Sequence, residues 1–205
     1  IYFTSIFDDE AGGDTNGDGG ATLPTEFDDW GINFRPGSTG TFAHSVVRYS
    51  YGGVFAHRSV LSLDHVEFAS STDAIGADRS AITLDRIFVH DILEDGLWGN
   101  ASTFTVRNSE IRGVLFGDAM TFSEGSKVII EDSKVIDVGT GSALGLYGSD
   151  ATTTRSVFEG GLDAGIELYR TVFPLVAPSS IFITESTVSD FFDSGILLFS
   201  SQGRV

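Results

Sequence analysis

The chain has 205 residues, no cysteine, and a net charge of −17 from 29 acidic and 12 basic residues. The charge excludes nucleic acid as a partner, because a phosphate backbone would be repelled, and the absence of cysteine excludes disulfides and thiolate metal sites. Hydrophobic residues make up 41% of the chain, enough for one sizeable core, and none of the apolar runs is long enough to span a membrane. We therefore predict one domain over residues 1–205, cut from a longer chain.

The first distinctive segment is the stretch FDDEAGGDTNGDGG at residues 7–20. Within it, Asp14, Asn16 and Asp18, followed by Gly19, match the start of an EF-hand-type calcium loop. Short oxygen-bearing side chains at alternate positions of a tight turn can converge on Ca²⁺, which takes about six to eight oxygen ligands. The alternative is an acidic loop that is merely solvated.

We predict that residues 7–30 form an inserted loop that binds Ca²⁺ in a structural role. The expected twelfth-position glutamate falls on Thr25, so the closing ligands must come from other acidic residues. The candidate ligands are Asp8, Asp9, Glu10, Asp14, Asn16, Asp18 and Asp28.

From residue 42 onward the sequence carries a degenerate repeat. The repeat has four inward positions. Counted from the first, the second lies two residues later, the third five residues later and the fourth seven residues later. The frame fits seven segments, which begin at Phe42, Leu61, Ile82, Phe104, Val128, Ala151 and Ile181. Because the first copy runs Phe42, His44, Val47, Tyr49, it predicts that His44 lies in the core.

A second short segment accompanies each copy and usually opens on a small residue. Its first apolar residues are Ile32, Val54, Ile75, Leu97, Met120, Leu144, Ile166 and Ile196. Subtraction gives spacings of 22, 21, 22, 23, 24, 22 and 30. A period near 22 with two or three strands per repeat predicts an all-β parallel β-solenoid of about eight coils. The long last spacing predicts a loop insertion at residues 171–180.

These repeats resemble the right-handed parallel β-helix proteins of the pectate-lyase-like superfamily. The segment IYFTSIFDDEAGGDTNGDGG, followed by DDWGINF, is similar to one found in secreted bacterial and archaeal members. The resemblance implies a right-handed β-helix and a secreted or cell-surface location. It does not select one function, because the superfamily includes lyases, hydrolases and adhesins.

Two features bear on a site. The outward face of the second segment carries Tyr147, Tyr169 and Phe199 at equivalent positions in successive coils, which predicts an aromatic strip that covers the sheet or binds a ligand. No catalytic residue is assigned, because the polygalacturonase signatures, serine elbows and nucleotide-binding loops are absent from the sequence.

The sequence thus favours a non-catalytic, calcium-stabilised extracellular module that contacts a polysaccharide or a neighbouring protein chain, as an adhesin does. The alternative is a polysaccharide lyase or glycoside hydrolase of the β-helix type, with Arg107, Arg112 or Arg170 near an acidic groove. A chain with a charge of −17 offers few positive groups to hold a polyuronate, so we favour the module.

Overall fold

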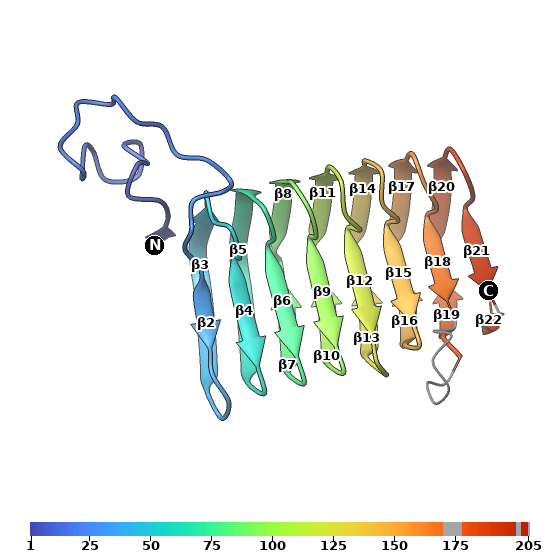
Figure 1. Ribbon diagram of the computed structural model, residues 1–205. Helices are drawn as coiled ribbons and strands as arrows, with labels where there is room; N and C mark the ends of the chain where they lie inside the picture. The colour runs from blue at the N-terminus through green and yellow to red at the C-terminus, as the bar shows by residue number, and fades with distance from the viewer. Residues whose placement is uncertain (170–177, 200–201, 205) are drawn as a thin grey trace.

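The computed structural model describes residues 1–169, 178–199 and 202–204, and they form a parallel β-helix (Figure 1). Its two sheets, of eight and fourteen strands, contain only parallel pairs. The eight strands of the first sheet are β2 (Ile32–Phe34), β4 (Val54–His57), β6 (Ile75–Asp78), β9 (Leu97–Asn100), β12 (Met120–Ser123), β15 (Leu144–Tyr147), β18 (Ile166–Tyr169) and β21 (Ile196–Phe199).

The fourteen-stranded sheet supplies the other two legs of each turn. Its first leg contains β7 (Ala81–Asp85), β10 (Thr103–Arg107), β13 (Lys127–Glu131), β16 (Asp150–Thr154), β19 (Ser180–Thr184) and β22 (Gln202–Arg204). Its second leg contains β8 (Phe88–Ile92), β11 (Glu110–Val114), β14 (Lys134–Val138), β17 (Val157–Gly161) and β20 (Thr187–Phe191). The long strands β3 (Thr39–Arg48) and β5 (Val60–Ser71) run through both legs, and β1 (Tyr2–Phe3) pairs with β3.

The turns from β4 to β20 number about six and have a neighbouring turn on each side. The prediction of about eight coils is therefore slightly too high, because it also counted the turns at the two ends of the stack. The structure contains no helix among the described residues, so none of them forms a membrane-spanning helix.

The strand register agrees with the sequence repeat except in its first copy. Phe42 pairs with Leu63 and Val47 with Phe68, so the first inward position is Gly40, two residues before Phe42. The prediction that His44 lies in the core is wrong: His44 is exposed, has φ 49°, and stacks on His65 with ring centroids 4.8 Å apart. Glycine at the first inward position hid the true start of the repeat.

Two columns of buried serines mark the corners of the turns. In the first column the Oγ of each serine accepts a hydrogen bond from the backbone N–H of the serine in the preceding turn, as Ser102 Oγ does from Ser80 N and Ser126 Oγ from Ser102 N, both at 3.0 Å. Buried backbone groups need partners, so these hydroxyls stabilise the stack where the strand ladder is interrupted. The second column contains the buried Ser109, Ser133 and Ser156 and ends at the half-buried Ser186.

The acidic loop extends from the N-terminal end of the stack (Figure 1). Contacts that hold it there include hydrogen bonds from Arg48 to the Asp8 carboxylate at 2.8 and 2.9 Å, from Tyr51 N to Asp28 O, and from Thr72 Oγ1 to Glu26 O. The insertion predicted at 171–180 lies outside the described residues except for its last three positions.

Candidate functional site

The acidic loop brings together three of the seven predicted calcium ligands. Carboxylate oxygens of Asp9, Asp14 and Asp18 all lie within 4.8 Å of one another. Asp9 Oδ1 is buried without a hydrogen-bond partner. Burial, followed by the charges of Asp14 and Asp18, raises the pKa of the Asp9 carboxyl. An unpartnered carboxylate oxygen facing two further carboxylates fits a hard cation such as Ca²⁺.

The other four candidate ligands lie outside this cluster and have hydrogen-bond partners in the protein. Within the cluster, Asp14 accepts from the backbone N–H groups of Asp18 and Gly19, and Asp18 accepts from that of Thr22, so the unpartnered oxygen is that of Asp9. Asp8 is buried against Arg48, and Glu10 lies 3.4 Å from the same guanidinium. Burial alone would raise the pKa of the Asp8 carboxyl, but hydrogen bonds from Arg48 and Thr4 lower it below its usual value. Asn16 donates to Asp18, and Asp28 accepts from Thr25. The cation would thus depend on the first three residues, completed by backbone oxygens or water.

The outward face of the eight-stranded sheet carries the predicted aromatic strip. Tyr147 pairs with Tyr169 and Tyr169 with Phe199 in the strand register. Their rings stack in parallel at 5.4 and 4.6 Å between centroids, with interplanar angles of 7° in both pairs. Because the rings cover one another's faces, a ligand can reach mainly their edges and the two tyrosine hydroxyls.

A second aromatic group lies toward the N-terminal end of the same face. Trp98 on β9 leans over Gly76 on β6 and stacks on Phe55 of β4, with centroids 5.3 Å apart. With Trp30 and Tyr51, these rings line a pocket of about 530 Å³. Trp30 also donates its indole N–H to Tyr49 O, which anchors the end of the acidic loop.

A column of carboxylates runs along the edge of this face, where the chain enters the sheet. Asp73 lies in the aromatic pocket, and Asp95 and Asp118 follow in the next two turns. One oxygen of each accepts a backbone N–H from the next turn, at 3.1 Å from Asp95, 3.1 Å from Asp118 and 2.7 Å from Ser142. This arrangement fixes the carboxylates, and side-chain hydrogen bonds from Trp98 to Asp73 and from Thr121 to Asp118 add to it.

The carboxyl groups of this column have raised pKa values. Burial, and then the negative charges of Asp73 and Asp118, raises the pKa of Asp95 to about 7. Burial is also the main cause of the raised pKa of Asp73 and of Asp118. Carboxylic acids that stay partly protonated near neutral pH occur at binding and catalytic sites as well as in structural clusters.

Glu167 extends this polar cluster toward the aromatic strip. It is 7% exposed and accepts a hydrogen bond from Ser142 Oγ at 3.2 Å, while Ser142 N donates to Asp118. A hydrogen bond to Glu167, and then burial, raises the pKa of Tyr169 to about 12. Ser142 therefore links two carboxylates beneath the tyrosines.

The sequence analysis missed the carboxylate column. Its signal was nevertheless present: Asp73, Asp95 and Asp118 each stand two residues before the first apolar residue of a sheet strand, at Ile75, Leu97 and Met120. The structure does not bring the arginines of the alternative reading to this cluster. Arg107 pairs with Glu131 and Arg112 with Glu110, both on the other sheet, and Arg170 lies outside the described residues.

Comparison with known proteins agrees with the fold. The sequence profile described as the right-handed beta helix region matches residues 30–205, so the chain belongs to the right-handed β-helix family. No curated protein matches the sequence closely enough to be called a relative.

Two solved structures are similar. The periplasmic alginate epimerase AlgG matches with a TM-score of 0.53 and 12% identity, over 80% of this chain and 48% of the epimerase. The chain thus spans about half the length of the epimerase. The catalytic domain of a GH87 alpha-1,3-glucanase matches with a TM-score of 0.29 and 9% identity, over 86% of this chain and 56% of the glucanase chain. At these identities the likeness to the epimerase concerns the fold alone.

Proposed function

We propose that the protein binds a polysaccharide along the outward face of its eight-stranded sheet, as a non-catalytic module of a secreted or cell-surface protein. The pocket formed by Trp30, Tyr51, Phe55 and Trp98 carries this proposal. Aromatic rings offer apolar faces to the C–H groups of a sugar, and Asp73 at the pocket accepts hydrogen bonds from hydroxyls. The aromatic strip Tyr147, Tyr169 and Phe199 would extend the binding track with ring edges and hydroxyls.

The charge of the track bears on the ligand. Among the described residues, no Arg, Lys or His pairs with Asp95, Asp118 or Glu167. A polyuronate would therefore meet uncompensated negative charge. We expect a neutral polysaccharide to bind more tightly than an anionic one. The same shortage of positive groups supports a binding role over a lyase reaction.

Tryptophan fluorescence provides the test, because Trp30 and Trp98 are the only tryptophans in the chain. Titration with neutral oligosaccharides should change the emission, and Trp98→Ala should weaken binding about tenfold or more, the effect expected of an aromatic anchor. Phe192→Ala, at an 86% exposed ring far along the stack, is the matched control and should bind like the parent. Equal binding by parent and Trp98→Ala, measured by calorimetry, would remove the pocket from the proposal.

Asp95 favours a second candidate, a glycoside hydrolase. Such enzymes need one carboxyl that is protonated near neutral pH and a second that is ionised, and Asp95 beside Asp118 offers two carboxyls in adjacent turns. New reducing ends released by the parent, and lost in both Asp95→Asn and Asp118→Asn, would establish this reaction over simple binding.

Calcium belongs to the proposal as a structural ion. The support is the Asp9, Asp14 and Asp18 cluster with its unpartnered Asp9 oxygen. Bound there, the ion would relieve the repulsion among the three carboxylates and order the loop beside the aromatic pocket.

A further inference from the structure

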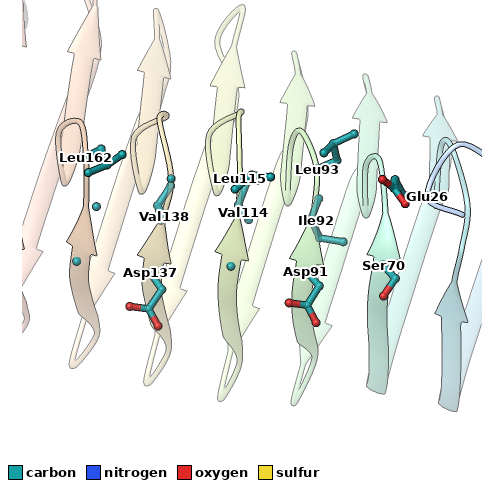
Figure 2. Close-up of a pocket in the computed structure, with 14 residues that line it drawn as sticks. Glu26, Ser70, Asp91, Ile92, Leu93, Val114, Leu115, Asp137, Val138 and Leu162 are labelled. Carbon is teal, nitrogen blue, oxygen red and sulfur yellow. The ribbon is translucent and has the colours of Figure 1, made fainter.

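A second concavity lies on a different part of the molecule, where β8, β11, β14 and β17 end and the chain bends toward the eight-stranded sheet (Figure 2). It has a volume of about 740 Å³ and crosses successive turns of the stack. At its N-terminal end it reaches Glu26 of the acidic loop. We call it the leucine groove, after Leu93, Leu115 and Leu162.

Backbone geometry makes the groove. In four successive turns, Asp91, Gly113, Asp137 and Gly160 have positive φ values of 54°, 62°, 54° and 74°. At this position of the turn, aspartate and glycine therefore alternate from one turn to the next. A Cβ at Gly113 would lie 3.6 Å from Asp91 Oδ1, and one at Gly160 would lie 3.5 Å from Asp137 Oδ1. Each carboxylate thus leans toward the glycine of the next turn, where no side chain fills the space.

The floor of the groove is aliphatic. Leu115 and Leu162 are 50% and 62% exposed, and Gly139 lies between them, where a Cβ would lie 2.0 Å from Leu115 O. None of the described residues that line the groove is aromatic. Sugars favour aromatic faces, whereas exposed leucines in a groove suit the aliphatic side chains of a polypeptide. This difference separates the leucine groove from the aromatic pocket.

The rim is acidic. Asp91 and Asp137 lie on alternate turns, Glu26 adds a third carboxylate, and none of the described residues that line the groove is basic. Asp91 Oδ2 lies 2.7 Å from His90 Nδ1, while Asp91 Oδ1 lies toward Gly113 in the groove. Turns of a β-helix are about 4.8 Å apart, so the two aspartates are separated by roughly 10 Å along the axis, between the spacings of about 7 and 13 Å for residues two and four apart in an extended segment. Positive side chains on an extended segment could reach both.

We propose that the leucine groove binds an extended segment of a partner protein in which aliphatic residues alternate with lysine or arginine. The aliphatic side chains pack on Leu93, Leu115 and Leu162, and the positive groups pair with Asp91 and Asp137. Because this chain has few lysines and a net charge of −17, a second copy of it is a poor occupant.

The test uses three acetylated, dye-labelled octapeptides: alternating Lys and Leu, alternating Lys and Ser, and alternating Glu and Leu. Fluorescence anisotropy should show saturable binding of the Lys/Leu peptide alone, weakened by added NaCl because the rim pairs are screened. Equal binding of the Lys/Ser peptide or of a chitosan oligosaccharide would mean that any polycation binds and would overturn the proposal. So would an absence of Lys/Leu binding at millimolar concentration.

Variants locate the binding. Asp91→Asn with Asp137→Asn should weaken Lys/Leu binding about five- to tenfold, and Leu115→Ala about threefold, as expected for exposed ion pairs and for part of a leucine side chain. The controls are Glu124→Gln, an exposed acid away from the groove, and Val60→Ala, a 55% exposed residue on another leg. If the controls weaken binding as much as the groove variants do, the leucine groove is not the site. Circular dichroism checks that each variant is folded.

Discussion

The Asp95 carboxyl is partly buried between Asp73 and Asp118, and its pKa is about 7. Its folded-state pKa therefore lies above the unfolded value, and the native state holds a proton that the unfolded chain has released. Stability from this group is fully present below about pH 4 and is lost as the pH rises through about 7.

Relative to the parent, Asp95→Asn should therefore be more stable at alkaline pH than at acid pH. The substitution removes the negative charge, and the amide oxygen can still accept the hydrogen bond from Asp118 N. The free-energy difference between variant and parent should change by up to about 3 kcal/mol between pH 4.5 and pH 8. Urea unfolding at the two pH values measures it. Parallel pH profiles for the two proteins would show that Asp95 ionises normally.

The aromatic pocket depends on the absence of a side chain at Gly76. A Cβ there would lie 2.4 Å from Trp98 Cε2 and Cζ2, so the indole would have to leave Phe55. Gly76→Ala should weaken oligosaccharide binding, shift the tryptophan emission, and destabilise the fold by about 1–3 kcal/mol from overpacking. Ala77→Gly, its neighbour on the core side, should destabilise without the change in binding. Unchanged emission in Gly76→Ala would contradict the stacking geometry.

At the scale of the element, the sequence predicts the strands correctly wherever buried residues recur at every second position. Phe104, Val106 and Ile111 pair in register with the inward residues of their neighbours, as the repeat predicted, and Ser109 N donates to Ser133 Oγ in the next turn. The carboxylate column was not recognised because an aspartate before a strand is also an ordinary turn residue. Its burial and raised pKa arise only when successive turns stack, which one repeat alone does not reveal.

Removing a hydroxyl from one of the serine columns should destabilise the protein. Ser126 Oγ accepts from the buried N–H of Ser102 at 3.0 Å and donates to a backbone carbonyl. Ser126→Ala leaves that N–H without its partner and should lower the free energy of unfolding by about 1–3 kcal/mol. Ser62→Ala, at an exposed position of β5, should change it by less than about 0.5 kcal/mol. Equal effects in chemical denaturation would mean that water replaces the hydroxyl.

At the scale of the whole molecule, stability depends on neighbouring turns and on a large negative charge. In a solenoid each turn contacts only its neighbours, so an ion bound at one end acts first on the turn that it touches. The acidic loop is joined to that first turn through the Asp8–Arg48 pair and the bond from Tyr51 N to Asp28 O. Salt screens the net charge of −17 everywhere, whereas calcium bound at the proposed site of Asp9, Asp14 and Asp18 would act at one place.

Removing calcium should therefore lower the melting temperature in a way that sodium chloride does not restore. Binding to the native state alone stabilises by about 2.7 kcal/mol when the free ion is a hundredfold above its dissociation constant. Asp14→Asn combined with Asp18→Asn should abolish the calcium-dependent part of the melting temperature, because two of the three converging carboxylates lose their charge. Asp150→Asn, an acidic residue far from the loop, should respond to calcium like the parent. If melting with chelator and with calcium coincides at equal ionic strength, the loop is a solvated acidic segment and the proposed ion is absent.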